Sequence, residues 1–120
     1  MPALLDLAAS AARHAAARQS MIATNVANAD TPGYRAFDLE PFSPDLGAVG
    51  MRRTHPGHLG AEDGPARRVA LDAVANDPNG NGVTLEDQIL RGVDAQRAHG
   101  RAVTVYSTAL DMLRAGLGRR

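Results

Sequence analysis

The chain has 120 residues, no Cys, and 13 basic residues balanced by 13 acidic ones, so its formal net charge is zero. The lack of Cys excludes disulfides, zinc–thiolate sites and thiol nucleophiles, and the lack of a basic excess argues against nucleic-acid binding. No apolar run reaches the length that spans a bilayer, so no direct membrane insertion is expected. With 23 alanines and no Trp, the single domain 1–120 buries little apolar area per residue. We therefore expect a marginal monomer that is stabilised by neighbouring molecules.

The N-terminal segment 1–30 is predicted to be one long helix, because residues 3–30 contain neither Pro nor Gly. Apolar and small residues recur there in steps of three and four, which is the spacing of a helical stripe. One such stripe consists of Leu5, Ala8, Ala12, Ala15, Gln19, Ile22 and Val26. A second stripe beside it consists of Leu4, Ala8, Ala11, Ala15, Arg18, Ile22, Asn25 and Ala29. Stripes of small side chains favour close packing against another helix.

Residues 25–34 end this helix with the order Asn-Val-Ala-Asn-Ala-Asp-Thr-Pro-Gly-Tyr. Pro32 disfavours helical geometry in the residue before it, and Gly33 can adopt the positive φ that a turn needs. Asn25 and Asn28 lie three apart on one helical face, where their amides need hydrogen-bond partners. One interpretation is a frayed helix end with solvated asparagines. The other is that both amides bond across helices and fix their register, as buried asparagines do in coiled coils.

The middle segment 31–82 holds six of the seven prolines and has no sustained periodicity. Residues 34–39 alternate well enough for one short extended piece, and residues 67–74 are compatible with a short strand or with none. We expect the rest of this loop-rich segment to become ordered only on contact with a partner.

Two patterns in the middle segment resemble metal sites. His55 and His58 lie three apart, but Pro56 and Gly57 between them favour a turn over a helical zinc site. Residues 77–82 imitate the start of a calcium loop, but Gln88 stands where the bidentate Glu would be needed. No nucleophile–base spacing or phosphate-binding glycine motif is found, so we predict no metal, no cofactor and no enzymatic activity.

The C-terminal segment 83–120 is predicted to be a second long helix, with Thr84 as its N-cap and the glycines at 116 and 118 at its end. Its apolar residues follow a sustained heptad-like spacing, which is typical of a coiled coil. This C-terminal stripe consists of Ile89, Gly92, Gln96, His99, Val103, Tyr106, Leu110, Leu113 and Leu117. Gly92 and Gly100 each cost about 1 kcal/mol relative to Ala in a helix, which weakens its first half.

These elements predict a mainly α fold. The long N- and C-terminal helices pack as an antiparallel, coiled-coil-like pair, and the irregular middle carries at most short β pieces.

Four stretches of the chain resemble the family of bacterial flagellar rod and hook proteins. Residues 21–34 are similar to the family's N-terminal signature, a helix with Asn-(Val/Ile)-Ala-Asn followed by Thr-Pro-Gly-Tyr. Residues 53–59, 79–86 and 106–114 resemble further elements of the proximal-rod branch of this family. The short length is also that of rod subunits, which lack the inserted outer domain of hook-type proteins.

The resemblance implies a structural subunit of the proximal rod, the part of the flagellar basal body that crosses the periplasm. It implies export through the flagellar type III apparatus without a cleaved signal. It also implies self-association in a helical assembly with other rod proteins and contact with the export gate or the MS-ring adaptor. The residues expected at subunit interfaces are Asn25, Val26, Asn28, Asp30, Thr31, Pro32, Gly33, Tyr34, Val103, Tyr106, Leu110 and Leu113.

Two alternatives stay open at this point. A sibling proximal rod protein shares the N-terminal motif, and a secreted two-helix binding or adaptor module would have the same helical layout. The adaptor predicts a folded monomer with one saturable partner, whereas a rod subunit predicts a poorly folded monomer that polymerises with its sister proteins.

Overall fold

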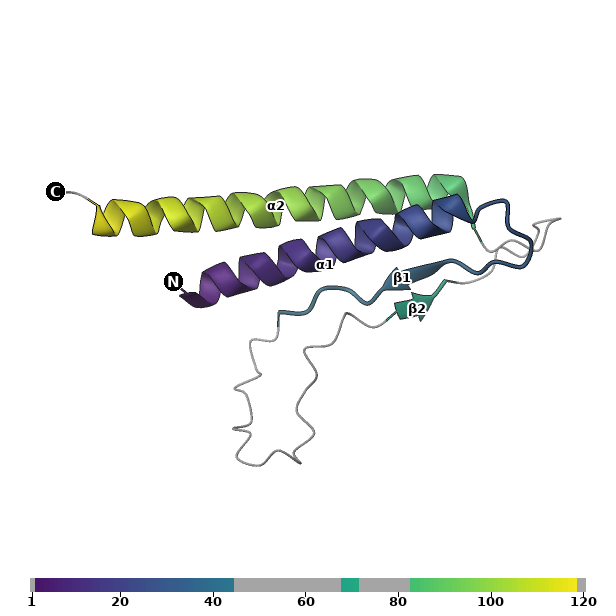
Figure 1. The fold of residues 1–120 in the computed structure, drawn as a ribbon, viewed down its shortest axis with the longest axis horizontal. Coiled ribbons are helices and arrows are strands. Elements are labelled where there is room, and N and C mark those ends of the chain that lie inside the picture. The colour runs from purple at the N-terminus through teal and green to yellow at the C-terminus, as the bar shows by residue number, and fades with distance from the viewer. Residues whose placement is uncertain (1, 45–67, 72–82, 119–120) are drawn as a thin grey trace, which may run out of the picture.

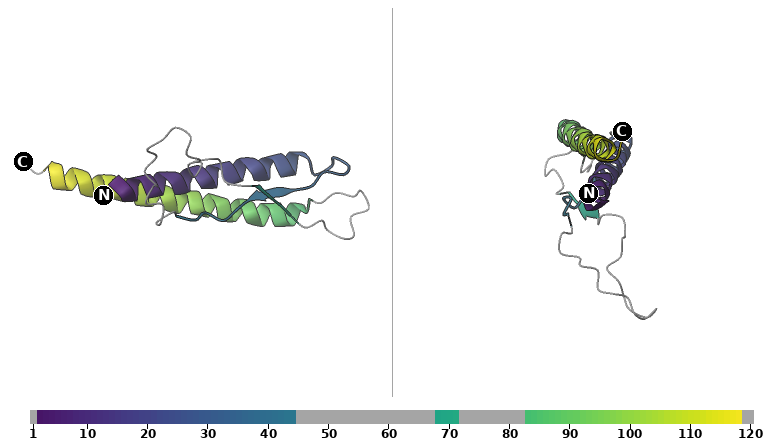
Figure 2. Two further views of the ribbon diagram at one scale, coloured as in Figure 1. Left: turned by 90° about the horizontal axis from the view of Figure 1, so that it is seen from below. Right: turned by 90° about the vertical axis from the view of Figure 1, so that its left-hand side faces the viewer.

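The fold is that of a computed structural model, which describes residues 2–44, 68–71 and 83–118. It contains helix α1 (Pro2–Ala27), strand β1 (Phe37–Leu39), strand β2 (Arg68–Ala70) and helix α2 (Leu85–Leu117). The two helices run antiparallel and side by side, and the two strands lie along α1 (Figures 1 and 2). The predicted antiparallel pair of terminal helices with only short β pieces is therefore confirmed.

Helix α1 ends three residues before the predicted boundary at residue 30. The backbone amide of Asn28 is shared between the carbonyls of Thr24 and Asn25, and the Ala29 amide bonds the Val26 carbonyl. These three-residue bonds tighten the chain into a turn before Pro32 is reached. Gly33 follows with φ +76°, as the turn chemistry predicts. At the other end, Pro2 suits the first helical position, where a missing N–H costs nothing.

Helix α2 keeps the predicted end signals with one difference. Glu86 and Asp87 occupy the first turn, where negative charge interacts favourably with the helix dipole. Gly118 is the C-cap residue, and its amide bonds the Arg114 carbonyl at 2.7 Å. Thr84 is the N-cap residue with extended backbone, but its side chain makes no capping hydrogen bond. Thr84 is therefore the N-cap residue by position, as predicted, but the side-chain hydrogen bond expected of an N-cap threonine is not formed.

The helices meet along residues that repeat every seven positions. Those of α1 are Ala8, Ala15 and Ile22, and those of α2 are Ala95, Ala102 and Ala109; all six are buried. We call these six residues the alanine seam. Because five of these six side chains are alanines, the two backbones approach closely along most of the contact, and the seven-residue spacing keeps the contact on one side of each helix.

The C-terminal stripe is not the face that α2 buries within the chain. Ile89 is 62% exposed and Val103 is 48% exposed, whereas Ala95 and Ala102 on the neighbouring face are buried. The coiled-coil spacing was predicted correctly, but the contact is rotated around the helix from the large side chains to the small ones. The reason is that packing against the alanines of α1 rewards close approach, which bulky residues prevent. The large residues of the stripe are exposed or half-buried.

Strands β1 and β2 form an antiparallel pair in which Phe37 is opposite Ala70 and Leu39 is opposite Arg68. The Leu71 amide extends the ladder to the Ala36 carbonyl. The extended piece predicted within 34–39 is thus present as β1, and of the two options for 67–74, a short strand or none, the structure has the short strand. Only β1 has a buried centre, at Asp38, whereas all three residues of β2 are exposed. No helix in the described residues is long and apolar enough to span a membrane.

Candidate functional site

The side chain of Asn25 connects α1, α2 and β1. It is 1% exposed, and its Nδ2 group donates to the Phe37 carbonyl at 2.7 Å and to Gln88 Oε1 at 3.0 Å. Its Oδ1 atom accepts from the Phe37 amide at 3.2 Å and from the Tyr34 hydroxyl at 3.3 Å. A carboxamide has two N–H donors and two acceptor positions, so the hydrogen-bonding capacity of Asn25 is fully used.

Asn25 completes the edge of β1 that β2 does not cover. Its amide bonds both the N–H and the C=O of Phe37, as a neighbouring strand would. The Ala36 carbonyl, one residue earlier, points to the other side and bonds Leu71. The Asn25 side chain therefore holds β1 against the helix pair at a defined position along α1.

Gln88 is the partner of Asn25 on α2. It is also 1% exposed and occupies the position seven residues before Ala95. Its Oε1 accepts the cross-helix bond, but its Nε2 finds no acceptor among the described residues. A buried polar group is costly unless it is bonded. Among the described residues, the bond to Asn25 is the one side-chain hydrogen bond that compensates for part of the burial of Gln88.

Asp38 forms a second link between the same three elements. Arg18 of α1 binds its carboxylate with two parallel bonds of 2.9 and 3.0 Å, and Arg91 Nη1 of α2 lies 2.6 Å from Asp38 Oδ2. The Leu39 amide donates to Oδ1 at 2.7 Å, and Arg91 Nε also pairs with Asp87 at 2.8 Å. The Asp38 side chain is only 8% exposed, which makes this a largely desolvated cluster.

The ion pairs of this cluster favour the charged forms of both Asp38 and Arg91. Burial by itself would raise the pKa of Asp38, but the bonds from Arg18, from the Leu39 amide and from Arg91 outweigh it and lower that pKa. The pKa of Arg91 is raised, chiefly by its hydrogen bond to Asp87. Asp38 is therefore ionised at neutral pH and bonded on both oxygens. We refer to the Asn25 and Asp38 clusters together as the polar layer.

Asn28 does not bond across the helices, which corrects the prediction made for it. Its Nδ2 donates to the Thr24 carbonyl at 2.8 Å, and its Oδ1 accepts from the Thr31 hydroxyl at 3.2 Å. Both partners belong to the end of α1 and the turn that follows. The side chain closes the helix, because the last carbonyls of a helix lack partners within it. Of the two asparagines, Asn25 alone reaches α2.

The other predicted interface residues lie away from the polar layer. Asp30, Thr31, Pro32 and Gly33 form the exposed turn after α1, and Val26 is 43% exposed beside it. On α2, Val103 and Tyr106 are exposed and Leu110 and Leu113 are half-buried. Tyr34 is the exception, since its hydroxyl belongs to the polar layer. The structure thus separates these residues into an internal set and a surface set.

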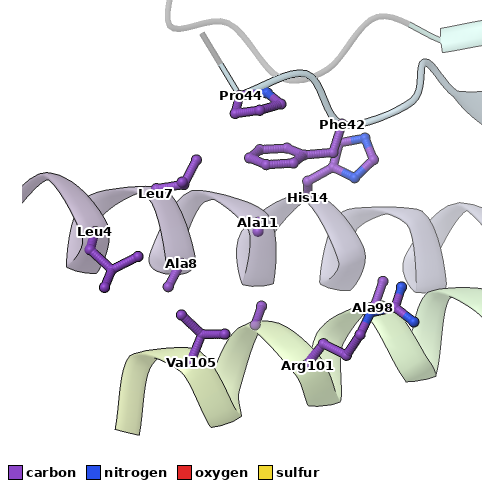
Figure 3. A pocket seen from close by; sticks show the side chains of 11 residues that line it. Leu4, Leu7, Ala8, Ala11, His14, Phe42, Pro44, Ala98, Arg101 and Val105 are labelled. Atoms are coloured by element: carbon purple, nitrogen blue, oxygen red, sulfur yellow. The ribbon is translucent and has the colours of Figure 1, made fainter. Parts of the chain in front are cut away.

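An open groove of about 390 Å³ lies between the two helices and the segment after β1 (Figure 3). Leu4 and Leu7 of α1, Val105 of α2 and Phe42 are the large apolar residues that line it. His14 holds the segment in place: its Nε2 lies 2.7 Å from the Glu40 carbonyl, and its ring centroid is 5.6 Å from that of Phe42. The lining offers packing surface and no arrangement of reactive groups.

Within the described ranges, no group of three or more His, Asp or Glu residues could hold a metal ion. The predicted turn with His55 and His58 and the calcium-like loop 77–82 lie outside the described residues.

Sequence reasoning did not select Asp38, Arg18, Arg91 or Gln88. Gln88 carried a usable signal, because it occupies the same seven-residue spacing as the three alanines of α2. Asp38 is the only acidic residue within 34–39. The two arginines that bind it lie 20 and 53 residues away in the chain. Nothing in the local spacing connects these three charges.

The amino-acid sequence was compared with protein families and with known proteins. Residues 5–35, which include most of α1 and the turn after it, match the family model described as flagella basal body rod protein. Over 106 residues the chain is 33% identical to the flagellar basal body rod protein FlgB of Agrobacterium fabrum (strain C58 / ATCC 33970). That alignment covers 80% of this chain and 78% of the relative. The chain therefore belongs to the flagellar basal body rod protein family.

Proposed function

We propose that this chain is a structural subunit of the proximal rod of the bacterial flagellar basal body, with no catalytic role. The observation that carries the proposal is the apolar surface of α2. Within the C-terminal stripe, Ile89, Val103 and Leu117 are 62%, 48% and 86% exposed. A helix face this apolar is typical of a surface that is covered by another protein.

The two sides of the helix pair differ in a way that supports assembly through the stripe. Arg91 and Val105 lie on the side of the alanine seam that faces β1 and the segment after it. The C-terminal stripe is on the other side of the seam, because its members lie one and four residues after each buried position. The flank of α2 with Arg91 and Val105 therefore contacts other parts of the chain, although Val105 is still 43% exposed, and the opposite flank carries the C-terminal stripe that we propose for neighbouring subunits.

The proposed partners are further copies of this chain and sister rod proteins, in a helical assembly that crosses the periplasm. A contact between two different faces of one molecule produces an open helical filament when its rotation does not close a ring. The first subunits would also contact the export gate or the MS-ring adaptor. Export without a cleaved signal through the flagellar type III apparatus belongs to the same proposal. A likeness to FlgB that covers most of both chains favours this function over a secreted adaptor and over the sibling rod protein FlgC.

A pair of charge substitutions on α2 tests the proposal. Val103→Glu places a charge in the stripe, and Thr104→Glu places the same charge one residue further on, at a position that is also exposed but lies outside the stripe. In a strain that lacks the native gene, we expect V103E to be exported but to abolish swimming and filament formation, while T104E restores both. Equal swimming by the two strains would contradict an interface at the stripe. Circular dichroism of both purified variants checks that the helices are retained.

A further inference from the structure

The alanine seam by itself does not define how far α2 is displaced along α1. Its buried positions on α2 repeat every seven residues, and the same spacing continues from Ala109 to Gly116. If α2 moved by seven residues, about 10 Å along its axis, Ala102 would take the place of Ala95 and Gly116 that of Ala109. A small residue would still occupy every one of these places. The alanine positions of α2 are therefore compatible with both registers.

The displacement would also leave the overlap of the helices unchanged. Helix α1 has 26 residues and α2 has 33, so one heptad of α2 has no partner on α1 in either register. In the observed register α2 continues past the start of α1, and the unpaired heptad is the C-terminal one (Figure 1). It includes Met112 and Leu117, which are 56% and 86% exposed. In the displaced register the unpaired heptad would be the first one, with Ile89 and Leu90.

The polar layer distinguishes these two registers. After a seven-residue displacement Ala95 would stand opposite Asn25, which would lose the Gln88 oxygen that now accepts its bond at 3.0 Å. Ala98 would replace Arg91 beside Asp38, so the carboxylate would lose the bond of 2.6 Å. A displacement in the opposite direction would push the Gln88 amide into the seam and place residue 81, which precedes α2, at the level of Asn25.

We propose that Gln88 and Arg91 are positioning residues that lock α2 in one register through Asn25 and Asp38, and so determine which end of α2 is presented to the next subunit. The register lock is a property of the isolated chain. Its consequence for assembly rests on the proposed function, since only there does the unpaired heptad meet a neighbour.

The distance between two spin labels reports the register directly. Because the chain contains no Cys, the substitutions Ala23→Cys and Ser107→Cys label one exposed position on each helix. Pulsed electron spin resonance on labelled chains diluted with unlabelled ones restricts the signal to pairs within one molecule. The parent chain is expected to give one distance, and the displaced register would shorten it by up to about 10 Å.

The variant N25L/Q88L removes both amides while keeping side chains of similar size. The shorter-distance population should rise at least about tenfold, which is the change that the loss of one buried hydrogen bond produces. The control N28L/Q96L makes the same two chemical changes at positions that form no cross-helix bond, and it should keep the single parental distance. The variant R91M, which removes the bond to Asp38, should shift the population in the same direction by a smaller factor.

Three results would overturn the register lock: one unshifted distance in N25L/Q88L, an equal shift in the control, or loss of helical circular dichroism in N25L/Q88L. The last would show that the seam cannot hold the helices without the polar layer. Swimming of a strain that carries N25L/Q88L then tests the consequence separately. A shifted register with normal swimming would overturn the assembly role and leave the lock intact, whereas failure of the V103E test would contradict the rod interface alone.

Discussion

The alanine seam and the polar layer hold the same two helices together in opposite ways. The seam is built from apolar side chains that repeat, all of them alanines except Ile22, so it rewards close approach at several positions along the axis. The polar layer is built from groups that occur once, and each requires one particular partner. Buried polar groups add little net stability, because hydrogen bonds and charge pairs mostly repay desolvation. The comparison indicates that packing drives the helices together, while hydrogen-bond and charge matching selects one arrangement.

The largest effect is expected from removing the Asp38 carboxylate, which Arg18 and Arg91 both bind. Asp38→Ala leaves Arg18 and Arg91 beside a site with no anion, and we expect a loss of about 3 kcal/mol in the free energy of unfolding. Urea titration followed by circular dichroism measures it. Asp111→Ala is the matched control, because its side chain is 70% exposed and its contact with Arg114 is 3.7 Å long. The loss in the free energy of unfolding of this control should stay below about 0.5 kcal/mol. A similar loss in both variants would show that the Asp38 cluster stabilises the fold no more than an exposed ion pair does.

Enlarging a seam residue tests how closely the helices pack. Ala95 has no exposed surface, so Ala95→Leu must separate the helices or displace its neighbours, at a cost of about 2 kcal/mol. Gln96→Leu adds a leucine at the next position, which is exposed, and should leave the urea midpoint nearly unchanged. If A95L were as stable as Q96L, the seam would be loosely packed and the contrast with the polar layer would fail.

The pH dependence of stability isolates the polar layer without changing the seam. The pKa of Asp38 is lowered in the folded chain, so its contribution is fully present above the unfolded pKa and is lost as the pH falls toward the folded one. The urea midpoint should be constant from pH 7 to pH 5 and should fall below about pH 4. Asp38→Asn cannot titrate, so the stability gap between the parent and this variant should narrow in acid. A gap that stays constant down to pH 3 would contradict the ion-pair assignment.

The smallest expected effect is a gain in stability. A Cβ placed on Gly92 would lie 3.9 Å from Ile22 Cγ2, which is an ordinary contact. Gly92→Ala should therefore stabilise the chain by about 0.5 to 1 kcal/mol through helix propensity, measured as a higher melting temperature. Gly100→Ala is the reference, since nothing lies within 4 Å of its added Cβ. Destabilisation by G92A alone would show that the helices are closer at Ile22 than the ordinary contact implies.

Local sequence was enough to predict the two long helices, the turn at Pro32-Gly33 and the extended piece at 34–39. These features depend on backbone chemistry that acts within a few residues, namely proline-free stretches, a positive φ at glycine and the alternation of side chains. The spacing of Asn25 also marked it correctly as a residue in need of a partner. The identity of that partner could not be predicted, because Gln88 is 63 residues away and becomes a neighbour only when the helices pair.

Two features depended on the packing of distant segments. Periodicity placed the contact of α2 on its large apolar residues, but α1 offers a surface of alanines, and only alanines on the other side can pack closely against it. The Asp38 cluster likewise draws its charges from α1, β1 and α2, so it exists only after all three are assembled. Helical spacing is a property of one segment, and the sequence was sufficient to predict it. Which face is buried depends on the shape of the opposing surface, and that was settled by the folded chain.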